Sequence, residues 1–345
     1  MSSKKTEILD FIKSNPVSSS KEIHEGLQLS MGYATVKRIL TGLLAERMVI
    51  TEGAGRGTRY KTGPAFELFY PIDTRHYFSH EIDERKIISG FNHTLIREVL
   101  PHVKLFSDKE LLFLKQLNET YSAKKAKLTA SLYKKEMERL SIDLSWKSSQ
   151  IEGNTYSLLE TERLLKENET AAGKSKEEAI MLLNHKKAID QIIEKPDELF
   201  PVTRHSIEKI HTALVAGLGV DLGTRTTGVG ITGTNYKPLE YEQQITRAMN
   251  DMCKLIDQQS SVFNKALLLL VLISYIQPYT DGNKRTARIV SNAVLIHGKT
   301  CPVSYRTTDS MEFKKAMLLF YEQNNITRIK DIFIEQFNFA VNTYF

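Results

Sequence analysis

Most of the chain repeats apolar residues at the 3.6-residue spacing of an amphipathic helix. The pattern dominates from residue 87 to the end and predicts a helical core. The predicted helical segments are 108–141, 156–168, 175–194, 204–217, 240–257, 261–277, 284–298 and 309–322. The expected fold class is therefore mainly α.

Residues 223–238 interrupt the helical pattern. They are rich in glycine and threonine, and Val229 and Ile231 occupy alternating positions. Alternation between turn-forming residues is typical of paired strands. The sequence therefore predicts an extended β-hairpin beside the helical core.

The first 62 residues carry a separate and shorter pattern. Ile8, Phe11 and Ile12 recur at helical spacing, and Ser19 and Glu22 have the spacing of a capping box that opens a second helix. A third helix is expected to begin near Ser30. Its apolar face would consist of Val36, Ile39, Leu40, Leu43 and Leu44.

A short hairpin is expected after these three helices. Residues 48–51 and 58–61 favour strands, and the residues between them are rich in glycine. Three short helices followed by a hairpin resemble the winged helix-turn-helix fold, a small α+β domain. The expected domains are a winged helix at 1–62, a connector at 63–107, a helical segment at 108–170 and a core at 171–345.

Positive charge is concentrated in the N-terminal segment. The chain has a formal net charge of +6, and residues 1–62 hold ten Lys and Arg against six Asp and Glu. The exposed side of the third helix and the hairpin tip could contact a DNA groove and its phosphates. The candidate DNA contacts are Lys37, Arg38, Arg56 and Arg59. The alternative is a winged helix that binds a protein or forms a homodimer.

Composition excludes several classes of protein. A hydrophobic fraction of 41% excludes disorder throughout, and two cysteines exclude a disulfide framework and a cysteine zinc site. The most apolar run, Ala266 to Ile276, is shorter than the roughly 20 residues that cross a bilayer. No signal peptide is evident, so we expect a cytoplasmic protein without a membrane partner.

The strongest chemical signal is the segment 277–288, which reads QPYTDGNKRTAR. It joins an apolar helix to a second helix whose first turns carry Arg285 and Arg288. Backbone N–H groups at a helix start, together with two arginines, form an anion site suited to phosphates. Asp281 is the candidate Mg²⁺ ligand, because Mg²⁺ on phosphates usually takes one or two carboxylates.

This segment resembles the signature of Fic-domain proteins, His-x-Phe-x-Asp-Gly-Asn-x-Arg-x-x-Arg. The resemblance spans roughly residues 87–340 and implies transfer of AMP from ATP, with Mg²⁺, to a hydroxyl side chain of a target protein. Tyr279 stands in place of the phenylalanine, and Gln277 stands in place of the histidine. The implied catalytic positions are Gln277, Asn283, Arg285 and Arg288. The implied nucleotide-binding residues are Asp281, Gly282, Asn283, Lys284, Arg285 and Arg288, with Ile231 and Thr232 from the segment where the family has its target-docking flap.

A second motif upstream resembles the inhibitory sequence of this family. It comprises Ser148, Glu152, Gly153 and Asn154. Ser148 and Glu152 are four residues apart, so they share one helix face. A carboxylate there can form a bidentate pair with Arg288 and withhold this arginine from the γ-phosphate of ATP.

The glutamine at position 277 leaves the function open. The family histidine takes the proton of the attacking hydroxyl, and losing such a base costs about 10²–10⁴-fold in rate. One hypothesis is an auto-inhibited and impaired adenylyltransferase. Another is a non-catalytic transcriptional regulator that binds DNA and senses a nucleotide. A third is a related transfer, of phosphocholine or UMP, because a phosphate site does not read the base.

Overall fold

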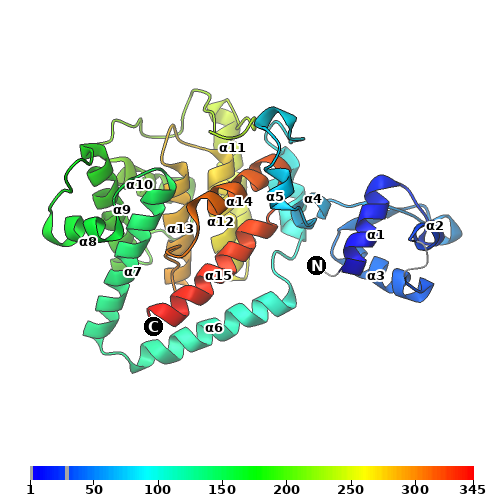
Figure 1. Cartoon of the computed structure of the whole chain (residues 1–345), viewed down its shortest axis with the longest axis horizontal. Helices are drawn as coiled ribbons and strands as arrows, with labels where there is room; N and C mark the ends of the chain where they lie inside the picture. Colours follow the sequence, from blue (N-terminus) through cyan, green and yellow to red (C-terminus); the bar gives the residue numbers. More distant parts are fainter. Residues whose placement is uncertain (1–2, 28–30) are drawn as a thin grey trace.

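The computed structural model describes residues 3–27 and 31–345 and is mainly α-helical, as predicted. The helices of the C-terminal core are connected mostly by short loops (Figure 1). They are α6 (Asp108–Lys127), α7 (Ala130–Ile151), α8 (Leu158–Glu167), α9 (Lys176–Glu194), α10 (Arg204–Val215), α11 (Glu242–Gln258), α12 (Val262–Ile276), α13 (Asn283–His297), α14 (Ser310–Gln323) and α15 (Thr327–Thr343).

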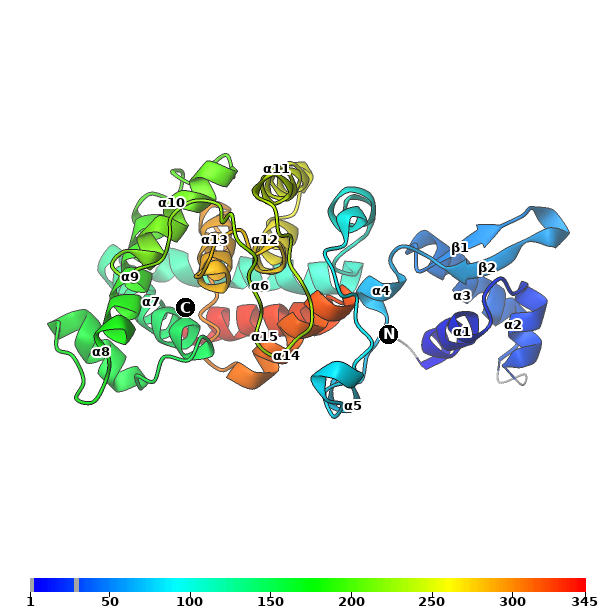
Figure 2. The ribbon, with the colours of Figure 1, turned by 90° about the horizontal axis from the view of Figure 1, so that it is seen from above.

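The N-terminal segment has its own small hydrophobic core. It contains α1 (Ser3–Ser14), α2 (Ser20–Gly26), α3 (Tyr33–Ala45) and the antiparallel strands β1 (Val49–Glu52) and β2 (Arg59–Thr62). The predicted hairpin and capping box are confirmed: Ser19 Oγ accepts from the Glu22 amide at 3.2 Å, and Glu22 Oε2 accepts from the Ser19 amide at 2.7 Å. The expected start of the third helix, Ser30, lies outside the described residues. Figure 2 shows this segment at one end of the molecule, with its hairpin pointing away from the core.

The connector is folded and packs on the core. It contains two one-turn helices, α4 (Phe66–Phe69) and α5 (Thr74–Tyr77), a π-helical turn at Leu95–Val99, and 3₁₀ turns at Ile82–Glu84 and Leu100–His102. Main-chain oxygens of α4 accept hydrogen bonds from the residues that precede α15. The Ile326 amide donates to Leu68 O at 3.0 Å, and Asn325 Nδ2 donates to Glu67 O at 2.8 Å.

Helix α12 lies at the centre of the core (Figure 1). Every residue from Ala266 to Ile276 is buried, so its apolar side chains contact neighbours on all sides. Such an all-round apolar helix is stable only inside a larger core. Helix α13 packs along α12, and this pair holds the segment that connects them in a fixed position.

Three predictions about helices and strands require correction. Residues 108–141 form two helices, because Thr129 caps a new one by accepting from the Leu132 amide at 3.2 Å. Helix α15 was not among the predicted segments. Residues 223–238 form an extended loop without a strand ladder, and their β-type contact is a single bridge between Gly90 and Lys237. Within the described residues no helix combines the length and apolarity needed to cross a bilayer.

Glu178 fixes the turn that follows α7. Its Oε1 accepts from the Thr155 amide at 2.6 Å and from Thr155 Oγ1 at 2.7 Å, and its Oε2 accepts from the Ser175 amide at 3.0 Å. These bonds lower the pKa of Glu178 to about 2, and the bond from the side chain of Thr155 has the largest effect. The charged carboxylate therefore joins the turn at 152–155 to the start of α9.

We expect Glu178→Gln to lower the free energy of unfolding by about 1 kcal/mol at pH 7, as for a lost helix cap. The pKa of Glu178 is lower in the folded state, so its contribution is complete above pH 4.5 and is lost as pH falls toward 2. Urea midpoints of the two proteins should thus converge over that range. Glu177→Gln, one residue away and exposed, is the control that should match the parent. A difference that stays constant with pH would contradict this assignment.

Candidate functional site

The site begins at the turn between α12 and α13. Gln277 ends α12 with φ of 52°, in the left-handed region. Its Nε2 donates to Ser274 O at 2.6 Å, and its Oε1 accepts from Asn283 Nδ2 at 2.9 Å. Asn283 also bonds the amide and the carbonyl of Tyr279, at 2.9 and 2.8 Å. The two side-chain amides therefore fix the turn and each other.

Gly282 is required at the start of α13. Its φ is 81°, and a Cβ there would lie 3.0 Å from Val215 Cγ1. Gly282 offers no side-chain cap, and the helical ladder begins with Thr286 N to Gly282 O at 2.9 Å. The preceding amides are therefore available to a ligand, at the positive end of the helix dipole. This is a suitable environment for an anion.

The two arginines of α13 are buried and differently paired. Arg285 Nη2 donates to Asp281 Oδ2 at 2.9 Å. Arg288 is fully buried; its Nε donates to Ser148 Oγ at 2.7 Å, and its Nη2 donates to Ser148 O at 2.9 Å and to Glu152 Oε1 at 2.7 Å. Nη1 of each arginine lacks a hydrogen-bond partner in the part of the chain that the structure describes. Each arginine therefore retains donors for a further acceptor.

The predicted contact between Glu152 and Arg288 is present, but it is not bidentate. One oxygen of Glu152 bonds Arg288, and the other lies 3.7 Å from Lys284 Nζ. Burial would raise the pKa of Glu152, but the charges of Arg288 and Lys284 outweigh burial and lower it. The carboxylate is therefore ionised at neutral pH, and its negative charge lies where an anion would bind.

The sequence-predicted residues of the helix turn, the loop and α7 meet in one pocket. We call it the site pocket; its volume is about 150 Å³. This is below the roughly 300 Å³ of pockets that enclose a whole small ligand, but it suits phosphate groups. Its lining residues are Glu152, Val229, Gly230, Ile231, Thr232, Gln277, Thr280, Asp281, Gly282, Asn283, Lys284 and Arg285. Arg288 and Ser148 lie behind this lining.

Two carboxylates line the site pocket, but Glu152 is paired with Arg288 and Lys284, which leaves Asp281 as the candidate metal ligand. Asp281 is 66% exposed and borders the site pocket, although one of its oxygens is shared with Arg285. Among the described residues no three His, Cys, Asp or Glu side chains cluster as metal ligands. This fits Mg²⁺ only in the form that phosphates themselves complete, with one protein carboxylate.

Two buried histidines support the site, and sequence reasoning assigned them no role. His185 Nε2 lies 2.7 Å from Ser148 Oγ, and burial, with the nearby Arg288, lowers the pKa of His185 well below its ordinary value. His211 Nε2 lies 2.9 Å from Asp281 O, and its ring stacks on Tyr279 at 3.7 Å between centroids. Burial also lowers the pKa of His211. Both rings are therefore neutral at pH 7 and act as hydrogen-bonding supports.

The four candidate DNA contacts belong to the N-terminal segment, with Lys37 and Arg38 on α3, Arg56 in the turn of the hairpin and Arg59 on β2. Figure 2 shows this segment at one end of the molecule. Lys37, Arg38 and Arg56 are exposed. Lys37 Nζ lies 5.1 Å from the ring centre of Tyr33. Arg59 is partly neutralised, because its Nη1 donates to Glu22 Oε2 at 2.6 Å.

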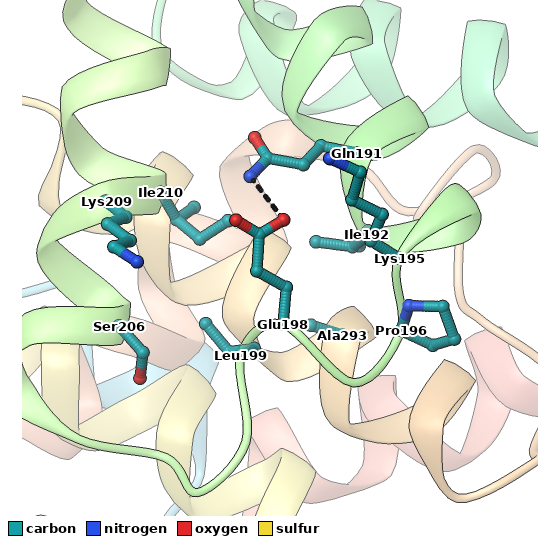
Figure 3. Close-up of a pocket in the computed structure, with 10 residues that line it drawn as sticks. All are labelled: Gln191, Ile192, Lys195, Pro196, Glu198, Leu199, Ser206, Lys209, Ile210 and Ala293. Atoms are coloured by element: carbon teal, nitrogen blue, oxygen red, sulfur yellow. Dashed lines mark hydrogen bonds between the residues drawn. The ribbon is translucent and has the colours of Figure 1, made fainter.

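A second hollow lies between α9 and α10 and is shown in Figure 3. Its wall combines Ile192, Leu199 and Ile210 with the hydrogen-bonded pair Gln191 and Glu198, whose Nε2 and Oε2 are 3.2 Å apart. Its volume is about 10 Å³, close to that of a single water probe. It therefore does not compete with the site pocket as a ligand site.

Comparison with known proteins shows which family the region of this site resembles. Residues 201–295 match the sequence model of the Fic/DOC family. The protein adenylyltransferase Fic of Nematostella vectensis is 29% identical over 176 residues, which are 48% of this chain and 40% of that protein. The chain thus spans two fifths of the length of this curated relative.

Solved structures show the same fold. A Fic domain-containing signalling protein of Bacteroides thetaiotaomicron has a TM-score of 0.58 at 18% identity, over 67% of this chain and 95% of that one. Fic-1 of C. elegans has a TM-score of 0.59 at 17% identity, over 68% of this chain and 72% of that one. The region that matches the family model, residues 201–295, contains the loop 223–238, the turn at 277–283 and α13 up to Leu295. Residues 201–295 therefore match a Fic/DOC domain, and in this match the motif turn (277–283) and the start of α13 line the site pocket.

Proposed function

We propose that this chain binds ATP and belongs functionally with the protein adenylyltransferases, with AMP passing to a hydroxyl side chain of a target protein. The observation that carries the proposal is the site pocket, where an uncapped helix start and buried arginines converge. The similarity to a relative named protein adenylyltransferase Fic supports it. Phosphocholine or UMP transfer remains the alternative donor chemistry, and competition among nucleotides distinguishes them.

Each group in the site pocket has a role in this proposal. The amides at the start of α13, with Lys284 and Arg285, hold the phosphates. Asn283 fixes the turn through its bonds to Tyr279. Mg²⁺, where bound, is held by Asp281 and neutralises phosphate charge. Ile231 and Thr232 line the site pocket from the loop 223–238.

Two features reduce transfer in the proposed mechanism. Glu152 occupies Arg288 and adds negative charge to a phosphate site, so it opposes binding of the γ-phosphate. Ser148 holds the same guanidinium from the other side. Gln277 has no titratable group, and both ends of its amide are already bonded within the turn. It therefore supplies no base for the attacking hydroxyl.

The two features are expected to be separable. Gln277→His restores a proton acceptor and should raise AMP transfer partially. Glu152→Gly frees Arg288 and should improve ATP binding with little transfer. The double variant should exceed the product of the single gains, within the 10²–10⁴-fold range of a general base, because a correctly placed phosphate is useful only to an activated nucleophile. Incorporation of labelled AMP into the protein and into a cell extract measures this.

Arg288→Ala in the double variant is the matched test, and it should remove the gained activity. Thermal unfolding of every variant must be followed, since breaking a buried pair costs about 3–5 kcal/mol. A folded double variant that transfers no more AMP than the parent would refute the transferase proposal. The nucleotide-sensing regulator would then be favoured.

We further propose that residues 1–62 are a winged helix-turn-helix domain that binds DNA, joined by the connector 63–107 to the segment 108–170 and the core 171–345. The supporting observation is a separate hydrophobic core of three helices and a hairpin, with exposed cations on α3 and at the hairpin tip. Phosphate contacts by such cations supply affinity that falls steeply with salt. The alternative function of this domain is contact with a second copy of the chain.

Replacing Lys37, Arg38, Arg56 and Arg59 with Ala should abolish a duplex-DNA shift seen at about 50 mM salt. The matched control removes the same charge from the core, with Lys134, Lys135, Lys187 and Lys254 replaced by Ala; all four are exposed. The control should bind DNA almost as the parent does. Equal losses in both variants, or no shift at all, would contradict specific use of the N-terminal domain.

A further inference from the structure

The loop 223–238 supplies four residues to the site pocket but has no secondary structure of its own. An extended loop of this length is held in place only if other groups satisfy and fix its backbone. Gly228 and Gly230 have open space at the position of a Cβ, whereas Ile231 is buried in the core, so packing holds this part of the loop at few points. Polar contacts fix much of the rest.

Arg225 closes the base of the loop. Its buried guanidinium donates to Thr227 O at 2.6 Å, to Leu239 O, and to Gln277 O at 2.7 Å. These bonds join both ends of the loop to the motif turn. They do not reach the portion after Thr232.

The connector fixes that further portion. Arg85 Nη2 donates to Gly233 O at 2.6 Å, and Asn235 Nδ2 donates to Asp83 Oδ1 at 2.7 Å. The Lys237 amide donates to Ser89 O at 2.8 Å. Three successive points of the loop thus bond to a segment about 150 residues earlier in the chain.

Arg85 is itself rigidly held. Its side chain is 4% exposed, and its Nη1 lies 3.2 Å from Oε1 of Glu322, whose side chain is fully buried. Glu322 Oε2 accepts from Tyr77 OH at 2.7 Å, and burial followed by this bond raises the pKa of Tyr77. The guanidinium of Arg85 therefore lies between two partners: it forms an ion pair with Glu322 on α14, and it donates a hydrogen bond to Gly233 O on the loop. A lysine has one nitrogen and cannot bridge them in this way.

We propose that Arg85 is a positioning residue, which places Val229–Gly233 over the site pocket by bridging Glu322 to Gly233 O. Its consequence for AMP transfer rests on the proposed function, but loop placement does not. Among the described residues the partners of Arg85 are Glu322, Gly233 O and the rings of Tyr77 and Phe78, and none of these is assigned to phosphate binding, so Arg85 acts through the loop. The connector is in this way part of the site.

Hydrogen–deuterium exchange of the full-length protein tests loop placement without any activity. Arg85→Ala and Arg85→Lys should each speed exchange of the amides between Thr232 and Lys237 by about tenfold, because a hydrogen bond to a charged donor is lost. Arg85→Lys keeps a cation beside Glu322, so it decides the result if Arg85→Ala fails to fold. Unchanged exchange in the folded variants would overturn the proposal.

Tyr77→Phe is the matched control. It removes a buried bond to the same Glu322 but leaves the Arg85 bond to Gly233 O intact. It should lower thermal stability while exchange in the loop stays at the parental rate. Equal acceleration of loop exchange in Tyr77→Phe would mean that Arg85 has only a general structural role, and the proposal would fail.

A kinetic test uses Gln277→His with Glu152→Gly as the parent. Adding Arg85→Lys should raise the apparent KM for ATP at least fivefold in self-modification, with kcat within twofold, because Ile231 and Thr232 wall the site pocket. Adding Tyr77→Phe should change neither constant. If the parent shows no transfer, the proposed function fails while the exchange result still decides the role of Arg85. An unchanged KM in an active parent would contradict the positioning role.

Discussion

A fully buried guanidinium, that of Arg288, determines how the helices around the site are arranged. A buried charge is tolerated only with hydrogen bonds and a counter-charge. Ser148 and Glu152 at the end of α7 supply both, and His185 of α9 bonds the same serine. Helices α7, α9 and α13 are therefore held together by one cation. Glu152 also lines the site pocket, so the group that satisfies this cation places its negative charge on the pocket wall.

The turn before α13 shows a different balance, in which backbone geometry matters more than charge. Gln277 and Gly282 both adopt positive φ, and the side chain of Asn283 lies between them and bonds Gln277 and Tyr279. A left-handed residue other than glycine costs roughly 1 kcal/mol or more, so surrounding contacts must impose it. Here the imposed shape leaves the first amides of the helix without a cap. Strain in the turn and the uncapped amides of the helix start thus have a common origin.

Local signals in the sequence were reliable where their physical cause was local. The capping box of Ser19 and Glu22, the N-terminal hairpin and the helix start at Asn283 depend on neighbours within a few residues, and each was predictable. Alternation at Val229 and Ile231 was misleading. Ile231 is buried against the helical core, and side-chain donors take the place of a partner strand.

The parts of the site that sequence reasoning missed depend on distant segments. Arg85 and Arg225 lie in stretches without a motif, and their partners are main-chain oxygens that a sequence does not mark. The second oxygen of Glu152 lies near Lys284 and not near Arg288, so the expected bidentate pair with Arg288 does not form. His185 is a different case, because it lies on α9, a helix that the sequence predicts, and its only distinguishing feature there is a titratable side chain. A histidine within a helical apolar pattern was the available signal, but it does not name a serine on another helix as its partner.

The bonds of Arg225 have a consequence for how this fold can diverge. One side chain ties both ends of the loop 223–238 to the turn at 277–283, so closure of the loop does not depend on the mostly exposed residues 226–230. Loop closure depends only weakly on length, at about 0.6 kcal/mol for each doubling. The mostly exposed residues 226–230 make none of the connector bonds, so insertions or replacements there would alter the surface beside the pocket while the buried part of the loop and the helical core keep their contacts. New recognition properties can arise in this fold at little structural cost.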